Sequence, residues 1–245
     1  MQKMTAVQCI KMVLFYLVLS LSSLVWSLVG LVCTPFLGNF ERRWHFVIQN
    51  WCRFAVFWAK YCVGLRYEIE GLENLPKQPC VVLAQHQSTW ETFFLTTLFC
   101  PLAHVVKREL FKVPVFGWAI ASFRPIAIDR SNPREALKQV AKMGKKRLQQ
   151  GCWVLIFPEG TRMPPGQMGK FTRSGAALAA GGGQAVLPIA HNAGKFWPKE
   201  GWAKYPGTIR VRIGPPMYAE GEGPRAIAGL SARAEAWVQQ AQQGL

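Results

Sequence analysis

Acidic residues are scarce in this sequence of 245 residues. It carries 13 aspartates and glutamates against 29 lysines and arginines, so its formal net charge is +16. A positive charge of this size indicates an anionic partner, either a nucleic acid or a membrane surface with anionic lipids. The sequence has no zinc-finger spacing and no recognisable nucleic-acid-binding module. We therefore expect membrane lipids, and no nucleic acid, among its partners.

Charged residues are absent from Met12 to Phe40. This stretch is longer than the ~20 apolar residues that span a bilayer. It is also longer than the ~7 to 15 residues of a signal-peptide core, so we expect a retained, membrane-embedded helix. Because basic residues flank it at both ends, charge alone leaves open whether the helix crosses the bilayer or enters and returns.

A Cys-x-x-Cys pair is also missing. The seven cysteines are scattered along the chain and odd in number, unlike the disulfide framework of a small secreted protein. We therefore expect buried free thiols, and a water-soluble part that lies in a reducing compartment. This predicts a location at the cytoplasmic membrane, with the soluble domain on the cytoplasmic side.

Several catalytic motifs are absent as well. Without a Gly-x-Ser-x-Gly elbow, a serine hydrolase with an acyl-serine intermediate is disfavoured. The segment 164–171 superficially resembles a phosphate loop, but Pro164 replaces its first glycine and Phe171 replaces its serine or threonine, which disfavours nucleotide hydrolysis. The four histidines share no metal-ligand spacing. We therefore expect neither a metal nor a cofactor.

Short β-rich runs alternate with longer helical stretches after residue 64. This alternation predicts an α/β fold with a mainly parallel sheet of about seven strands flanked by helices. An N-terminal membrane-embedded element of two helices, residues 1–64, precedes this domain, residues 65–245. The expected strands are Arg66 to Glu70, Val81 to Ala84, His104 to Lys107, Pro125 to Ile128, Trp153 to Phe157, Ala185 to Ile189 and Thr208 to Ile213.

Three helices can be placed from their sequence signals. The clearest is Pro133 to Gln150, which Ser131 or Asn132 would cap. A terminal helix is expected to begin near Ser231, after a segment rich in proline and glycine. The third is Trp44 to Val63, in which a basic stripe lies opposite tryptophans spaced seven residues apart. These tryptophans either lie at the headgroup level of a membrane or pack on the domain.

A histidine and a carboxylate lie five residues apart after the strand that ends at Ala84. On one continuous helix, His86 and Glu91 would be separated by roughly 140°, so they can meet only if His86 lies in the turn before the helix. Ser88 and Glu91 form a capping-box pattern that begins such a helix, Ser88 to Cys100. Two interpretations are open: a general base with its orienting acid, or an ordinary loop histidine beside a helix-capping glutamate.

A second polar turn follows the strand Trp153 to Phe157. It presents Glu159, the conformationally permissive Gly160, Thr161 and Arg162. The planar fork of an arginine side chain is suited to binding phosphate. Because ligands gather beyond the carboxyl ends of parallel strands, we expect one crevice to contain both this turn and His86.

These blocks together resemble the glycerophospholipid acyltransferase family, most closely the 1-acyl-glycerol-3-phosphate (lysophosphatidic acid) acyltransferases. Two further blocks agree in order and spacing, Lys107 to Arg130 and Val186 to Ala190. The resemblance covers roughly residues 66 to 215, and it departs from the family at Glu91, where aspartate is commoner. It implies that residues 65–245 are an acyltransferase catalytic domain.

The resemblance also implies roles for these residues. His86 would take the proton from the free hydroxyl of 1-acyl-glycerol-3-phosphate, and Glu91 would orient it. The hydroxyl oxygen would attack the thioester of acyl-CoA or an acyl-carrier protein directly, and backbone N–H groups at the start of the Ser88 helix would stabilise the oxyanion. The product would be phosphatidic acid.

Substrate binding would fall mainly to Arg162, which would bind the acceptor's phosphate. Arg130 or Lys107 would assist it, and Thr161 is a further substrate-binding candidate. Glu159 and Gly160 would shape the turn, and Glu159 could equally bind the acceptor's glycerol or only hold Arg162. The sequence leaves open another lyso-lipid acceptor, such as a lyso-aminolipid. More distant alternatives are a thioesterase and a non-catalytic protein that binds anionic lipids.

Overall fold

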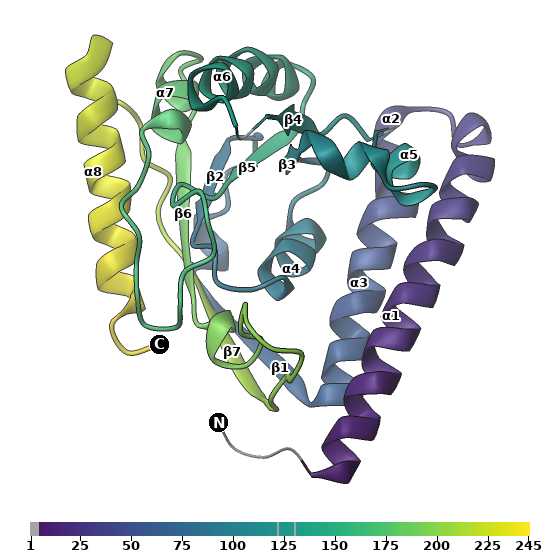
Figure 1. Cartoon of the computed structure of the whole chain (residues 1–245). Helices are drawn as coiled ribbons and strands as arrows, with labels where there is room; N and C mark the ends of the chain where they lie inside the picture. Colours follow the sequence, from purple (N-terminus) through teal and green to yellow (C-terminus); the bar gives the residue numbers. More distant parts are fainter. Residues whose placement is uncertain (1–4, 122, 130) are drawn as a thin grey trace.

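The computed structural model describes residues 5–121, 123–129 and 131–245, and its centre is a sheet of seven strands (Figure 1). Their order across the sheet is β1-β7-β6-β2-β5-β3-β4. All neighbouring strands are parallel except β6 and β7, so β1 and β7 run opposite to the other five. The strands are β1 Leu65–Glu70, β2 Val81–Ala84, β3 Leu102–Lys107, β4 Ile126–Ile128, β5 Trp153–Ile156, β6 Val186–His191 and β7 Gly207–Ile213.

The predicted α/β fold and its mainly parallel sheet are confirmed, and every predicted strand overlaps an observed one. The central strands were recognisable because they are buried on both faces. All residues of β2 and β6 are buried, and strands of this kind appear in the sequence as nearly continuous apolar runs.

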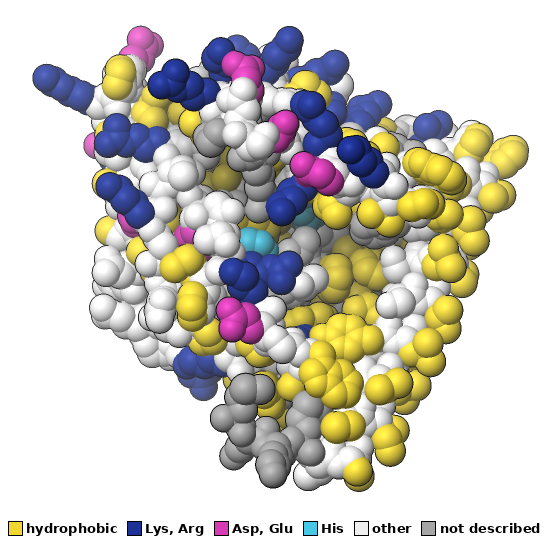
Figure 2. Space-filling model, viewed as in Figure 1, with side chains coloured by type: hydrophobic (Ala, Val, Ile, Leu, Met, Phe, Trp, Pro, Cys, Tyr) yellow, Lys and Arg dark blue, Asp and Glu magenta, His cyan; other side chains and the backbone are white. Residues whose placement is uncertain are grey.

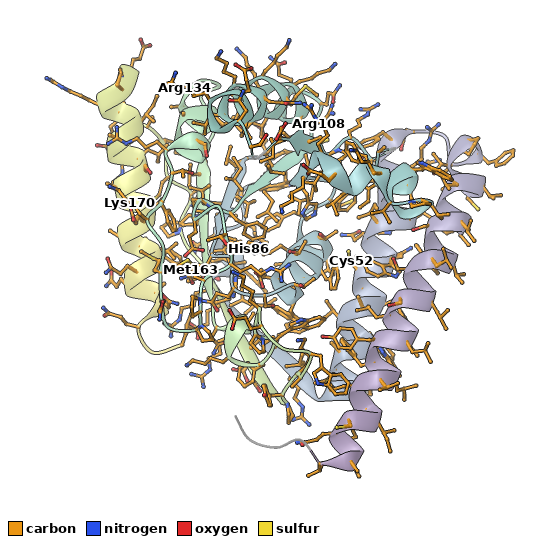
Figure 3. All side chains as sticks on the ribbon, viewed as in Figure 1. Cys52, His86, Arg108, Arg134, Met163 and Lys170 are labelled. Atoms are coloured by element: carbon orange, nitrogen blue, oxygen red, sulfur yellow. The ribbon has the colours of Figure 1, made fainter. Side chains whose placement is uncertain are left out.

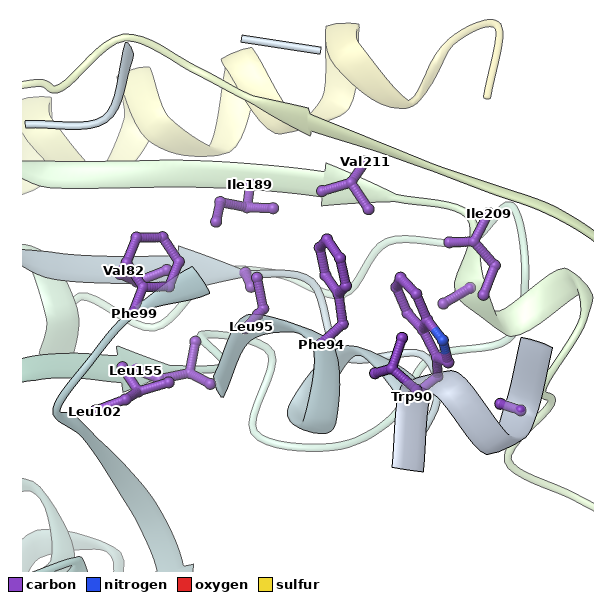
Figure 4. Close-up of a cluster of buried hydrophobic side chains, with 14 of the residues drawn as sticks. Val82, Trp90, Phe94, Leu95, Phe99, Leu102, Leu155, Ile189, Ile209 and Val211 are labelled. Carbon is purple, nitrogen blue, oxygen red and sulfur yellow. The ribbon is translucent and has the colours of Figure 1, made fainter. Parts of the chain in front are cut away.

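Helices cover both faces of the sheet, and the side chains of β2 alternate between two cores. Val82 packs with α4 and the N-terminal helices, whereas Val81 packs with α6, α7 and α8. Figure 4 shows the first core, where Phe94 and Trp90 of α4 lie against the sheet. The bounds are α4 Trp90–Leu98, α5 Phe116–Ala121, α6 Pro133–Gln149, α7 Ser174–Ala180 and α8 Gly223–Gln242.

The helix predicted from residue 133 is confirmed as α6, and the side chain of Asn132 caps it by accepting the N–H of Glu135. The predicted start of the terminal helix near Ser231 is wrong, because α8 begins at Gly223. Pro224 lies in its first turn, where the missing proline N–H breaks no hydrogen bond within the helix. The proline in this segment is therefore part of the helix start.

The N-terminal element consists of two long helical arms that lie side by side (Figure 1). The first is α1, Ala6–Cys33, which continues into a 3-10 turn, η1 Thr34–Phe36. The second runs from residue 40 to residue 63 through α2 Phe40–Trp44, the π-helical turn η2 His45–Gln49, α3 Asn50–Trp58 and the π-helical turn η3 Ala59–Val63. Gly64, with φ of +86°, ends this arm immediately before β1.

The tryptophans of the second arm pack inside the protein. Trp44 is buried, the indole N–H of Trp51 donates to Ser22 Oγ at 3.3 Å, and that of Trp58 donates to the carbonyl oxygen of Phe15 at 3.2 Å. Trp51 also packs edge-on against Phe93 of α4, and Trp44 and Trp58 pack in the core cluster that includes the domain. Of the two interpretations left open by the sequence, packing on the domain is therefore correct.

The membrane-compatible surface lies on α1 instead. Within the described residues, one helical segment, Ala6–Phe36, is long and apolar enough to cross a membrane. Its outward side presents large apolar side chains that nothing covers, as the yellow edge formed by this helix in Figure 2 shows. This face fits membrane association. Its members include Val7, Ile10, Leu14, Leu17, Leu21, Leu24, Leu28 and Val32.

Candidate active site

His86 and Glu91 meet in the turn between β2 and α4. His86 Nδ1 lies 2.9 Å from Glu91 Oε1. The carboxylate of Glu91 is fully buried and also accepts the backbone N–H groups of Gln87, at 2.9 Å, and Ser88, at 2.8 Å. Glu91 therefore contacts the histidine ring and closes the turn at the same time, as both interpretations of the sequence require, and the general-base role of His86 stays a prediction.

The carboxyl group of Glu91 is held in its charged form. Burial opposes its ionisation, but the hydrogen bond with His86, the electrostatic interactions with the imidazoles of His191 and His86, and the Ser88 N–H outweigh burial, so its pKa is lowered. An ionised carboxylate only accepts hydrogen bonds. His86 must then donate through Nδ1, which leaves the lone pair of Nε2 available to take a proton.

The start of α4 differs in detail from the predicted capping box. Ser88 Oγ accepts the N–H of Trp90 at 2.8 Å, and α4 begins at Trp90 instead of Ser88. The N–H groups of Gln87 and Ser88 are bound to Glu91. These three N–H groups therefore already have acceptors, and stabilisation of an oxyanion by the other N–H groups of the predicted helix start stays a prediction.

The turn after β5 grips the backbone of His86. Glu159 Oε2 accepts the His86 N–H at 2.8 Å, and the N–H of Met163 donates to the His86 carbonyl oxygen at 2.7 Å. The labels of His86 and Met163 lie next to each other in Figure 3. The imidazole also stacks on Phe157, with ring centroids 4.0 Å apart. Three contacts from one turn thus fix both the backbone and the ring of His86.

The carboxylate of Glu159 joins the His86 turn to the segment around Gly169. Its second oxygen, Oε1, accepts the N–H of Gly169 at 3.0 Å. Burial raises the pKa of this carboxyl group, the N–H groups of His86 and Gly169 act against that rise, and the charge of Glu91 adds to it. Both oxygens are therefore occupied by backbone donors, and neither donor is Arg162.

The remaining predicted site residues are Gly160, Thr161 and Arg162 in the turn after β5, and Lys107 and Arg130 elsewhere in the sequence. Gly160 adopts φ of +71°, which favours glycine and lets the turn direct the exposed Thr161 and the half-buried Arg162 past His86. Lys107 ends β3 and is exposed. Because β5 lies between β2 and β3, Lys107 shares an edge of the sheet with the two turns. Arg130 lies outside the described residues.

Besides the turns after β2 and β5, a third segment borders the site: the end of β6 and the loop that follows it. The sequence did not predict this segment. His191 Nε2 donates to the carbonyl oxygen of Gln85 at 2.9 Å, and its Nδ1 accepts the N–H of Ala193. Because Nδ1 accepts a hydrogen bond, the ring is in its neutral form, and burial, the largest cause, lowers its pKa despite the opposing charge of Glu91. Gly194 N–H donates to Gln87 Oε1 at 3.1 Å. The pairing of β6 with β2 brings this loop to the His86 turn.

Comparisons with known proteins agree with this geometry. Residues 66–192 match the family model described as acyltransferase. The chain is 63% identical over 235 residues to a Pseudomonas aeruginosa protein named 1-acyl-sn-glycerol-3-phosphate acyltransferase, and the match covers 96% of this chain and 91% of that one. It is 32% identical to a chloroplastic protein of the same name from Brassica napus, over 83% of this chain and 60% of that one.

A solved structure has the same fold. The 1-acyl-sn-glycerophosphate (LPA) acyltransferase PlsC from Thermotoga maritima superposes with a TM-score of 0.80 at 23% sequence identity, and the match covers 96% of this chain and 95% of that one. The family match runs from the second residue of β1 to the residue after β6, and it includes His86, Glu91 and Arg162. The chain belongs to the acyltransferase family.

Proposed function

We propose that this protein transfers an acyl chain from a thioester donor to the free hydroxyl of 1-acyl-sn-glycerol-3-phosphate and so makes phosphatidic acid. The observation that carries the proposal is the 63% identity, along nearly the whole chain, to a protein named for this activity. The oriented His86–Glu91 pair supports it, because transfer to a hydroxyl requires a base.

In the proposed mechanism, His86 Nε2 takes the proton of the acceptor hydroxyl while its Nδ1–H stays bonded to Glu91. The hydroxyl oxygen attacks the thioester carbonyl carbon, and the carbon–sulfur bond then breaks. The proton returns from His86 to the departing thiolate, so every atom is accounted for without an acyl-enzyme. A general base of this kind contributes on the order of 10² to 10⁴ in rate.

Arg162 binds the acceptor's phosphate in this proposal. It follows the turn that grips His86, so a phosphate held there would stand beside the acceptor's hydroxyl. Its guanidinium can donate two parallel hydrogen bonds to phosphate oxygens. Thr161, Gly160 and Glu159 shape the turn. Lys107, at the end of β3, is a further cation, and Arg130 is proposed as another from its place in the sequence. No metal or cofactor takes part; acyl-CoA or an acyl-carrier protein is a co-substrate.

The membrane is the source of the acceptor in this account. The apolar face of α1 anchors the protein at the cytoplasmic membrane, and the net charge of +16 draws it to anionic lipids and to the acidic donor. The catalytic domain lies on the cytoplasmic side, which is supported by seven free cysteines.

One assay separates this function from its alternatives. Detergent-solubilised protein is given acyl-CoA, or an acyl-carrier protein thioester, with and without 1-acyl-glycerol-3-phosphate, and thiol release and phosphatidic acid are measured. Release that depends on this acceptor supports the proposal. Release only with a different lyso-lipid reassigns the acceptor, release without any acceptor indicates a thioesterase, and no release favours a lipid-binding protein.

A further inference from the structure

Lys204 is a buried lysine that the proposed mechanism does not use. It lies in the loop between β6 and β7, and only 6% of its surface is exposed. Its ammonium group donates to the carbonyl oxygens of Gly201, at 3.3 Å, and Ala203, at 3.2 Å. No acid among the described residues forms a salt bridge with it. A buried charge without a counter-ion is costly, so its retention calls for a reason.

The lysine lies where the membrane helix meets the catalytic domain. Its Nζ is 5.6 Å from the ring centroid of Trp197 and 5.8 Å from that of Tyr16 in α1. Its backbone N–H contacts Met12 Sδ at 3.3 Å. Aromatic faces stabilise a cation, but they do not neutralise it. The ammonium group is thus held in place beside the helix along which a lipid headgroup would arrive.

The loop that carries Lys204 is tied to the active site. Its first part is bonded to the His86 turn through Gly194 and Gln87. The charge of Arg162 also reaches Lys204: burial, and after it the repulsion from Arg162, lowers the pKa of Lys204 to about 8. Figure 2 shows dark-blue side chains gathered beside the histidine at the place that Figure 3 labels His86, at the rim of a hollow.

Lys204 and Arg162 lie in two loops that are both bonded to the His86 turn, and two cations without an acid partner there would suit an anion with more than one charge. Within the described residues, Arg162, like Lys204, forms no salt bridge. A phosphomonoester carries a second negative charge near neutral pH, with a pKa near 6, whereas a phosphodiester carries one. Arginine offers a planar fork and lysine a compact point charge, so the two can bind different oxygens of one phosphate.

We propose that Lys204 is the second cationic arm, with Arg162 as the first, for the phosphomonoester of the acceptor, and that it selects this headgroup over phosphodiester lyso-lipids. The inference rests on the proposed function for the identity of the acceptor. The binding chemistry is that of a phosphomonoester lipid held between a lysine and an arginine, and it can be measured without acyl transfer.

The test compares Lys204→Met with Lys199→Met. Methionine keeps an unbranched chain against Tyr16 and Trp197 and removes the charge, and Lys199 is an exposed lysine of the same loop. Each change is combined with His86→Ala, and binding of 1-acyl-glycerol-3-phosphate, 1-acyl-glycerophosphoglycerol and CoA is titrated calorimetrically in detergent. In the His86 background, KM is measured for the lyso-lipid and for the donor.

Lys204→Met should weaken binding of the phosphomonoester lipid by at least about tenfold, weaken the phosphodiester lipid less, and leave CoA unaffected. The melting temperature should not fall, because a buried unpaired charge is removed. The acceptor KM should rise without the donor KM, and Lys199→Met should match the unaltered protein.

Equal loss for every ligand with a lower melting temperature would overturn the proposal in favour of a structural role. Loss confined to CoA would assign Lys204 to the donor, and unchanged binding would remove it from the site. The protein that keeps His86 could transfer no acyl chain while Lys204→Met still weakens binding of the phosphomonoester lipid. The proposed function would then be wrong, and the proposed binding site would be correct.

Discussion

At the scale of single residues, two carboxylates of the site accept hydrogen bonds, most of them from backbone N–H groups and one from a side chain. Glu91 binds His86 Nδ1 and two backbone N–H groups of the same turn, and Glu159 binds the His86 N–H and the Gly169 N–H. The position of the proposed base therefore depends on two acids from different turns, the buried Glu91 and the half-buried Glu159. Replacing either acid should alter the rate of reaction more than the binding of substrate.

Glu91→Gln should lower kcat by roughly 10² or more, since a neutral amide no longer requires His86 to donate through Nδ1. It should also change the dependence of stability on pH. The lowered pKa of Glu91 means that its ionisation stabilises the fold above its ordinary pKa of 4.5 and that this contribution is lost as pH falls through the folded value.

The measurement is urea unfolding of both proteins in detergent at pH 7 and pH 3. The stability difference should be present at pH 7 and smaller at pH 3, because protonation of Glu91 in the unfolded state begins as pH falls through 4.5. The comparison between the two proteins cancels Glu159, whose pKa is shifted upward. A difference that persists unchanged at pH 3 would contradict a stabilising charge on Glu91.

Arg162→Lys and Glu159→Gln should have opposite kinetic signatures. Arg162→Lys keeps the charge and loses the bidentate fork, so the acceptor KM should rise by roughly tenfold or more while the donor KM changes little. Glu159→Gln disturbs the backbone of His86, so kcat should fall with little change in either KM. Steady-state titration of each substrate checks both. Identical signatures for the two variants would mean that Arg162 only braces the turn.

At the scale of elements, much of this arrangement could be predicted from the sequence, because buried parallel strands have continuous apolar runs. Thus β2, with its four buried residues, was placed correctly. The start of α8 was missed because a proline in a first helical turn resembles a loop. The contact of His191 was missed because its partner, Gln85, is far away in the chain.

The two faces of α1 give a prediction for this element. Phe15 is fully buried against the domain, whereas Leu17 is 53% exposed on the outer face. In detergent, Phe15→Ala should destabilise the protein by about 3 to 5 kcal/mol, and Leu17→Ala should change its stability by less than about 0.5 kcal/mol. Denaturant unfolding of both variants checks this; comparable losses would show that the outer face of α1 is covered by protein.

At the scale of the whole molecule, the two N-terminal arms and the catalytic domain share one core. Met12 and Phe15 of α1 belong to the same buried cluster as Trp90 and Phe94 of α4, and α4 also carries Glu91. The helix that fits a membrane is therefore continuous in packing with the helix that positions the proposed base. This arrangement suits a reaction whose acceptor arrives from the membrane and whose donor arrives from water.

The most direct test of the account is acceptor-dependent thiol release by His86→Ala beside the unaltered protein, with acyl-CoA and 1-acyl-glycerol-3-phosphate in detergent. The unaltered protein should form phosphatidic acid. His86→Ala should lose at least about 10² of that rate with an unchanged melting temperature, since the imidazole contacts Glu91 and Phe157 at the edge of the core. A variant that keeps more than about a tenth of the rate would contradict a general-base role for His86.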